Sequence, residues 1–210
     1  MKDRELLEHA YSTPQLIPWD EPAVPFELSD LIKNKEILPG RVLDIGCGLG
    51  HHSIWLAQQG FTVTGIDIAE KAIAYAKNRA RLAKVTVEFI ALDALKINTL
   101  LDEQFDLVFE WGILHFIPFV KRKSYIKSIA HLLPKGGKYI SLSFNEKSPE
   151  WGGGKMRRGI TGATIYYSSM LDLEKLFRPY FKIIEKKERL TTFKNSGNTH
   201  LHNYFLLERK

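Results

Sequence analysis

The sequence predicts an α/β fold in which one parallel β-sheet is covered by helices on both faces. Five short runs rich in Val, Ile, Leu and Phe are separated, for the most part, by helical patterns. This alternation is typical of parallel strands that are joined by helical crossovers. With 210 residues, of which 44% are hydrophobic, the chain can bury one core of ordinary domain size. We therefore expect a single domain over residues 1–210.

The first two thirds of the chain contain the five expected strands and the helices between them. Apolar residues at helical spacing indicate helices after the first, second and fourth strands, and glycines end two of these helices. The expected strands are 41–46, 62–67, 86–93, 105–112 and 138–144, and the expected helices lie within 51–60, 72–80 and 125–133.

The two ends of the chain differ from this pattern. Residues 1–38 hold two short helical stretches separated by three prolines, and we expect them to form a helical lid. Residues 146–166 contain five glycines, which predict a mobile loop on the substrate side. Ser169 and Asp172 open a further helix. After it, residues 181–193 and 200–210 flank a turn-rich stretch and should form an antiparallel hairpin.

Composition excludes several classes of protein. The charged start of the chain does not resemble a signal peptide, and no stretch approaches the roughly 18 apolar residues of a membrane span. Cys47 is the single cysteine, which excludes an internal disulfide. We therefore expect a cytoplasmic protein without membrane contact. The net charge of +6 is compatible with a nucleic-acid partner, but the lysines and arginines are spread along the chain, as on a solvated surface.

A glycine turn follows the first expected strand, where α/β proteins bind ligands. Gly46, Gly48 and Gly50 stand at every second position, so the backbone can approach a ligand closely. A dinucleotide fingerprint needs its third glycine one residue later, where this chain has His51. The turn is therefore not expected to bind a pyrophosphate, and a nicotinamide dehydrogenase is disfavoured.

Three acids surround this turn. Asp44 precedes it, and Asp67 ends the second strand, 21 residues after Gly46, at the right reach for ribose hydroxyls. Asp93 ends the third strand, where it could accept a hydrogen bond from an adenine amine. Such a lining repels phosphates and suits a cationic nucleoside.

These motifs, in this order and at this spacing, resemble those of the class I S-adenosylmethionine-dependent methyltransferases. The resemblance runs from about Leu31 to the closing hairpin, and the prelude at 17–28 is loosely similar to the small-molecule branch near thiopurine and tellurite-resistance methyltransferases. It implies a Rossmann-like, doubly wound, seven-stranded sheet whose last strand is antiparallel. The matching motifs are DIGCGLG (44–50), GIDIAEKAI (65–73), ALDA (91–94), FDLVFEWGILHFIP (105–118) and LLPKGGKYI (132–140).

The resemblance also implies S-adenosylmethionine as the cofactor and assigns its contacts. Asp67 would hold the ribose, Asp93 and Ala94 the adenine, and the glycine turn, ordered by Asp44, the methionine portion. Trp111 would face the sulfonium, because an aromatic face attracts a cation. The full set of expected cofactor residues is Asp44, Gly46, Cys47, Gly48, Gly50, Asp67, Ile68, Asp93, Ala94, Glu110 and Trp111.

Methyl transfer from a sulfonium is an in-line displacement, for which the enzyme mainly aligns the reactants and excludes water. A thiol acceptor is partly ionised unaided, whereas a hydroxyl requires a base, for which His115 and Glu110 are the candidates. Both also have structural interpretations, as a hydrogen-bonding core residue or a cofactor contact. The residues do not decide whether the small-molecule acceptor offers sulfur, oxygen or nitrogen.

Four residues are expected at the substrate. Trp19 would cover the pocket, and the glycine-rich loop would bring Trp151, Arg157 and Arg158 over the acceptor, where an arginine could pair with an anionic group. No metal site is expected, because the pairs His51–His52 and His200–His202 lack acids at ligand spacing. Two alternatives remain: a methyltransferase acting on RNA or other nucleic acid, and a non-catalytic, methyltransferase-like binding protein.

Overall fold

The computed structural model describes residues 2–210 except 14–16, 18, 21, 101–103, 151–152 and 193–196. Its helices are α1 (Lys2–Ala10), α2 (Phe26–Lys33), α3 (His51–Gln58), α4 (Glu70–Leu82), α5 (Phe119–Leu132) and α6 (Met170–Phe177), with the 3-10 helices η2 (Ala94–Leu100) and η3 (Leu114–Phe116). Its strands are β1 (Arg41–Ile45), β2 (Thr62–Asp67), β3 (Glu88–Ala91), β4 (Leu107–Trp111), β5 (Lys138–Phe144), β6 (Met156–Arg158), β7 (Thr164–Tyr166), β8 (Phe181–Thr192) and β9 (Thr199–Arg209).

Seven strands form one sheet in the order β3-β2-β1-β4-β5-β9-β8. The pairs from β3 to β5 are parallel, and β9 is antiparallel to both β5 and β8. Strand order reverses between β1 and β4, which is the switch point where open α/β sheets bind ligands. The expected seven-stranded, doubly wound sheet with its antiparallel last strand is confirmed, as is the hairpin of β8 and β9.

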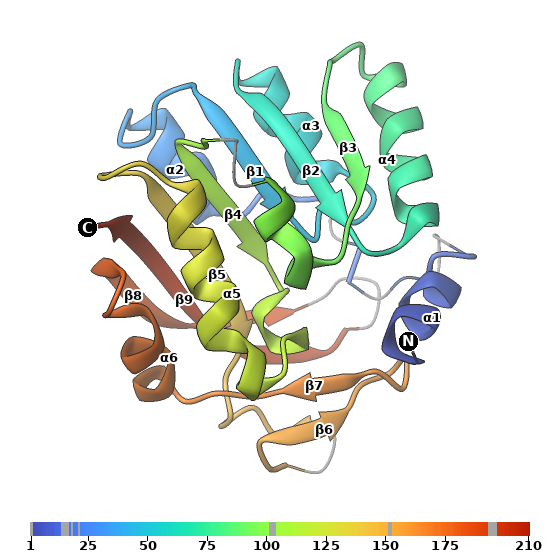
Figure 1. Ribbon diagram of the computed structural model, residues 1–210. Helices are drawn as coiled ribbons and strands as arrows, with labels where there is room; N and C mark the ends of the chain where they lie inside the picture. Colours follow the sequence, from blue (N-terminus) through green and yellow to red (C-terminus); the bar gives the residue numbers. More distant parts are fainter. Residues whose placement is uncertain are drawn as a thin grey trace.

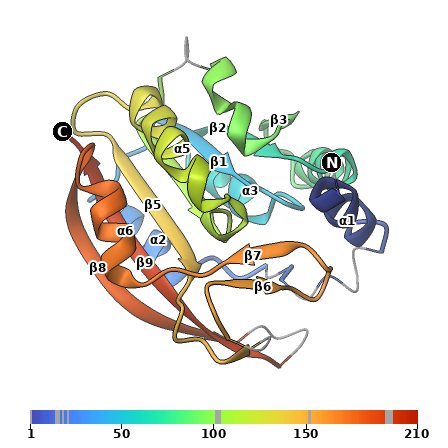
Figure 2. The same ribbon diagram turned by 60° about the horizontal axis from the view of Figure 1, so that its bottom comes forward.

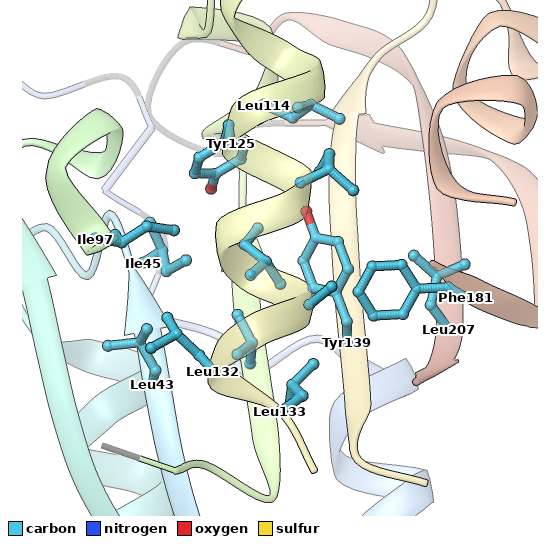
Figure 3. Close-up of a cluster of buried hydrophobic side chains, with 14 of the residues drawn as sticks. Leu43, Ile45, Ile97, Leu114, Tyr125, Leu132, Leu133, Tyr139, Phe181 and Leu207 are labelled. Atoms are coloured by element: carbon cyan, nitrogen blue, oxygen red, sulfur yellow. The ribbon is translucent and has the colours of Figure 1, made fainter. Parts of the chain in front are cut away.

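The strands are apolar on both faces because helices cover both. Along β1, Leu43 and Ile45 pack under α5, while Val42 packs on the opposite face. Figure 3 shows side chains of α5 and of neighbouring strands interlocked between helix and sheet, with Tyr125 and Tyr139 among them. Helices α5 and α6 belong to this face, and α2 and α3 to the other. One buried hydrophobic cluster thus lies on each face of the sheet, and this burial on both faces fixes the register of the strands.

The glycine-rich stretch is more ordered than expected. Strands β6 and β7 form a separate antiparallel pair, with Arg157 opposite Ile165. Gly159 and Gly162 close the turn, because Gly162 donates its N–H to the Gly159 carbonyl. The sequence analysis predicted a mobile loop and did not foresee this pairing. Their pairing is too short to give a strand signal in the sequence, since three residues show almost no alternation.

The carboxyl ends of the parallel strands point toward α1 and toward the β6–β7 hairpin (Figure 1). In the turned view, these two segments lie across that end of the sheet (Figure 2). Because they come from opposite ends of the chain, both can cover a site built on the strand ends. Among the described residues, none of the helices combines the length and apolar composition that crossing a bilayer requires.

Candidate active site

A cavity of about 950 Å³ lies at the carboxyl ends of the parallel strands. Its lining follows the order of the sheet. Asp93 and Asp67 come from the ends of β3 and β2, and residues 46–49 from the turn after β1. Trp111 ends β4 and residues 112–113 follow it. The remainder of the sheet contributes Leu142 and Phe144 from β5, His200 and His202 from β9, and residues 189–192 from β8.

The glycine turn is held in a conformation that side chains would disturb. Gly46 has φ +74°, and a Cβ atom there would lie 1.9 Å from the Ile113 side chain. The N–H groups of Gly46 and Cys47 both donate to the Ile66 carbonyl, at 2.7 and 2.9 Å. Gly48 has φ +52° and also lines the cavity. The turn thus presents bare backbone to the cavity, as the glycine spacing predicts.

Asp67 connects this turn to the end of β2. Its Oδ2 accepts from the Gly48 N–H at 3.0 Å, and its Oδ1 accepts from the Ala69 N–H at 2.9 Å. Burial raises the pKa of Asp67 to about 6, although these two hydrogen bonds oppose the rise. Each carboxylate oxygen has about two acceptor positions, so both oxygens can still accept from a ligand hydroxyl.

Asp44 and Gly50 do not line the cavity but support its wall. Asp44 is buried, and its Oδ2 accepts from the Ser53 hydroxyl of α3 at 2.5 Å. Burial raises the pKa of Asp44 to about 7. Gly50 has φ +83°, and a Cβ atom there would lie 2.9 Å from the Ala76 side chain. Both residues therefore support the turn from the side that faces away from the cavity.

The residues after β2 and β3 continue the same wall. Ile68, Asp93 and Ala94 all line the cavity. The Leu95 N–H donates to Asp93 Oδ1 at 2.9 Å, which fixes that carboxylate at the start of η2. The cavity half over β1, β2 and β3 therefore combines open backbone with two carboxylates, Asp67 and Asp93.

Trp111 marks the centre of the cavity, at the end of β4. Its ring stacks on Phe109 at a centroid distance of 5.7 Å, and the Arg189 guanidinium lies 5.1 Å from the Trp111 ring centroid. One face of the ring is thus already supported by the core. Because β4 lies between β1 and β5, Trp111 lies between the two sides of the cavity.

The N-terminal segment reaches the cavity through Tyr11 and Trp19. The Trp19 Nε1 lies 3.5 Å from the Tyr11 hydroxyl, and a Cβ atom on Gly48 would be 3.2 Å from that hydroxyl. Lys71 of α4 anchors the segment, since its Nζ donates to the Ser12 hydroxyl at 2.8 Å. The sequence prediction named Trp19 and missed Tyr11, because a lone tyrosine directly after a helix carries no motif.

Glu110 is placed differently from the sequence expectation, because it is buried outside the cavity lining. The period of two along β4 turns its side chain toward α5, while its neighbour Trp111 faces the cavity. Its Oε1 accepts from the Tyr139 hydroxyl at 3.0 Å and also from the Ser141 hydroxyl. Burial raises the pKa of Glu110 to about 7. These contacts make Glu110 a polar core residue rather than a base in contact with an acceptor.

His115 does line the cavity, from η3. Its ring packs against Phe116 and Phe144 at centroid distances of 4.7 and 4.3 Å. Burial, together with the nearby His202, holds the pKa of His115 well below its usual value, so the ring is neutral near pH 7. Its place in the site agrees with the prediction, and the environment suits a neutral contact with an acceptor.

Arg157 and Arg158 depart from the prediction of substrate cations, because neither lines the cavity. Arg157 is buried, lies over the Tyr167 ring at 3.7 Å, and donates to the carbonyls of Glu146, Ser148, Glu150 and Gly154. Arg158 is exposed and donates to the Gly162 carbonyl at 2.9 Å. Trp151 lies outside the described residues. The hairpin itself reaches the cavity through residues 159–161.

The sequence prediction missed cations and histidines that come from the closing hairpin. Arg189 of β8 lines the cavity, and its Nε donates to Glu27 Oε1 at 2.8 Å. His200 and His202 of β9 line it as well, although the sequence analysis considered this pair only as metal ligands. Within the described ranges, no group of His, Cys, Asp and Glu side chains has the arrangement of a metal site.

The doubly wound sheet thus carries an open glycine turn after β1 and carboxylates at the ends of β2 and β3. Residues 42–137 match the family model described as a methyltransferase domain. This match confirms, for that stretch, the resemblance of the sequence to methyltransferases. The matched stretch ends before β5, so the cavity lining contributed by β5, β8 and β9 lies outside it.

Two curated relatives are similar to this chain. The ubiquinone biosynthesis O-methyltransferase of Coxiella burnetii is 35% identical over 115 residues, which are 54% of this chain and 48% of the relative. The 2-heptyl-1-hydroxyquinolin-4(1H)-one methyltransferase of Mycobacteroides abscessus is 32% identical over 131 residues, or 61% of this chain and 56% of the relative. The chain thus spans about half the length of the curated relatives it matches.

Among solved structures, the 1,6-didemethyltoxoflavin-N1-methyltransferase of Burkholderia thailandensis, with bound 1,6-didemethyltoxoflavin and S-adenosylhomocysteine, superimposes with a TM-score of 0.70. The match has 20% sequence identity and covers 91% of this chain and 80% of the other. At this identity the likeness establishes the fold. Its coverage is wider than that of the family model, which ends at residue 137.

Proposed function

We propose that this chain binds S-adenosylmethionine and transfers its methyl group to a small aromatic acceptor. The proposal is carried by the two-part lining of one continuous cavity. One half, over β1 to β3, offers open backbone and carboxylates. The other half, over β5, β9 and β8, is lined largely by aromatic and aliphatic side chains and by histidines. A volume of about 950 Å³ is large enough for two ligands of moderate size.

The first half fits the cofactor on this chain's own contacts. Asp67 is fixed by two backbone N–H groups, and its oxygens are positioned to accept from vicinal hydroxyls of a ribose. Asp93 serves the adenine side, and the turn at Gly46 and Gly48 leaves room that a Cβ atom would fill. Carboxylates in this half disfavour a phosphate-bearing ligand and favour a cationic one.

When bound, S-adenosylmethionine supplies a methyl group that is already activated by the positive sulfur. What the chain must add is alignment and the exclusion of water. Trp111 lies at the boundary of the two halves, where an aromatic face favours a cation. Tyr11 and Trp19 close one side as a lid, and residues 159–161 close the substrate side.

Two observations support an aromatic acceptor. Phe116, Phe144 and Ile160 line the second half of the cavity, and flat apolar rings pack well against such side chains. The relatives described above are named for O-methyl transfer in ubiquinone biosynthesis and for methylation of a hydroxyquinolone. Both names point to acceptors of this shape and favour oxygen as the atom that is methylated.

The test is calorimetric titration with S-adenosylmethionine, S-adenosylhomocysteine and NAD, followed by transfer of labelled methyl to phenols, thiols and amines. We expect binding of the first two ligands, weakened in Asp67→Asn, and a labelled product with at least one phenol. Glu36→Gln, at an exposed position, is the matched control. Binding of NAD alone, or of none of the three, would refute the proposal.

A further inference from the structure

Three buried histidines surround Phe144 at the acceptor end of the cavity. His115 lies 4.3 Å from the Phe144 ring by centroid distance, His202 lies 4.7 Å away, and His200 lies 5.2 Å away. All three line the cavity. Side chains with titratable nitrogens are thus concentrated where the acceptor would bind, although no metal site is formed by the described residues.

His200 differs from the other two because it lies against a carboxylate. Its Nδ1 is 2.5 Å from Glu150 Oε1, and the side chains of His200 and Glu150 are 4% and 16% exposed. An ionised carboxylate accepts a hydrogen bond from Nδ1–H, which leaves Nε2 as the basic nitrogen of the ring. The same carboxylate stabilises the ring after it has gained a second proton.

The chain holds Glu150 firmly in this place. The Arg157 guanidinium donates to the carbonyls of Glu150 and Ser148, at 2.7 and 2.5 Å. The Ser148 hydroxyl accepts from the Leu201 N–H at 2.9 Å, next to His200 on β9. Burial opposes ionisation of Glu150, but hydrogen bonds from Ser148 and His200 keep the pKa of its carboxyl below the usual value. The buried Arg157, which does not reach the cavity, thus supports the segment that orients His200.

We propose that His200 is the catalytic base of this enzyme, that Glu150 is its positioning residue, and that the acceptor is therefore a hydroxyl compound whose proton must be removed. The inference rests on the proposed methyl transfer and names the acceptor class for the same cavity. The inference rests on geometry. The buried His200 ring lines the cavity and is oriented by the Glu150 carboxylate. The segment that holds Glu150 is in turn fixed by Arg157 of β6 and Leu201 of β9.

In the proposed step, the acceptor O–H gives its proton to His200 Nε2 while an oxygen lone pair attacks the methyl carbon. The new O–C bond forms as the C–S bond breaks, and the sulfur keeps that electron pair and becomes neutral. His200 is then an imidazolium hydrogen-bonded to the Glu150 carboxylate, and it releases its proton to water when the product leaves.

The other histidines are poorer proton acceptors in this structure. Burial and the neighbouring His200 lower the pKa of His202 to about 3, and burial also keeps the pKa of His115 well below its usual value. Both rings stay neutral through the working range of pH. Among the described residues, the titratable and charged groups near His200 include these two histidines and Glu150, with the guanidinium of Arg189 near His202 and that of Arg157 near Glu150.

The experiment compares wild type, His200→Gln and Glu150→Gln on phenols of graded acidity, from unsubstituted phenols to nitrophenols. With a weakly acidic phenol, we expect kcat/KM to fall about 100- to 10,000-fold in His200→Gln and less in Glu150→Gln. With a nitrophenol, which is already ionised, the loss should shrink to a few-fold. The affinity for S-adenosylmethionine should be unchanged in both variants.

The pH profile gives a second readout. General-base catalysis gives kcat/KM an acid limb, and this limb should vanish in His200→Gln. His131→Gln, at an exposed histidine near the end of α5, is the matched control and should behave as wild type. If His200→Gln folds poorly, Glu150→Gln and the wild-type profile still test the inference.

Several results would overturn it. An equal loss with acidic and weakly acidic phenols would indicate a structural role for His200. Wild-type rates in both variants would show that His200 is not the base. Transfer by wild type to thiols and amines, but to no phenol, would contradict the hydroxyl acceptor. In each of these cases cofactor binding and methyl transfer by wild type stand, so the proposed function survives. Absence of cofactor binding in wild type would instead overturn the proposed function, and this inference with it.

Discussion

Replacement of Glu110 by glutamine should stabilise the protein at alkaline pH without abolishing methyl transfer. The buried carboxyl has its pKa raised from the usual 4.5 to about 7, mainly by burial. The native state therefore holds this proton up to about pH 7, while the unfolded chain releases it near pH 4.5. As a result, the free energy of unfolding decreases as pH rises through this interval.

The size of the effect follows from the same shift. One unit of pKa corresponds to about 1.4 kcal/mol, so the ionised Glu110 costs about 3 kcal/mol of stability at pH 8. Glutamine can still accept hydrogen bonds from Tyr139 and Ser141 through its carbonyl oxygen. Between pH 4.5 and pH 8, the stability of Glu110→Gln relative to wild type should rise by about 3 kcal/mol, or about 6 to 12 °C in Tm for a chain of this length.

The assay is chemical denaturation at pH 4.5 and pH 8, followed by circular dichroism, with methyl transfer measured alongside. Comparing the two pH values cancels any fixed cost of the substitution itself. Glu36→Gln, an exposed glutamate, should show no such difference. If Glu110→Gln gains nothing at pH 8, or loses more than about tenfold in kcat with normal cofactor affinity, the description of Glu110 as a polar core residue is refuted.

Three further predictions concern Asp67, the Arg157 contacts within residues 146–158, and Gly46 in the glycine turn. Asp67→Asn should raise the Kd for S-adenosylmethionine about 10- to 100-fold, because an amide cannot serve the Gly48 N–H and a ribose hydroxyl as the carboxylate does. Wild-type affinity for S-adenosylmethionine should also weaken below pH 6, where Asp67, with its pKa of about 6, gains a proton. Titration calorimetry from pH 5 to 8 checks the affinity of the variant and the pH dependence of the wild type. An affinity that does not change with pH would contradict the role of Asp67 as a cofactor ligand. Arg157→Met should increase the rate of limited proteolysis within residues 146–158 by about tenfold or more, because four carbonyls lose their donor; unchanged cleavage would show that the segment holds without it. Gly46→Ala should destabilise the protein by about 1 to 3 kcal/mol, because of its positive φ and the contact with Ile113, and a neutral result in denaturation would mean that the turn can shift freely.

The local patterns of the sequence were sufficient for the framework of the site. Alternating helices and apolar strands predicted the parallel sheet. Gly46, Gly48 and the strand-terminal acids Asp67 and Asp93 line the cavity, and each position depends on its own strand and turn. The register of β1, with Leu43 on one face and Val42 on the other, follows from the period of two.

The half of the cavity lined by β5, β9 and β8 depends on contacts between distant parts of the chain. Glu110 and Trp111 are neighbours in sequence, but only the docking of α5 makes one a core residue and the other a cavity residue. His200 and Glu150 are 50 residues apart, and they meet because β9 inserts antiparallel between β5 and β8. That insertion brings the amino end of β9 to the edge where the parallel strands end, and strand pairing of this kind depends on packing across the whole sheet, which no local pattern specifies.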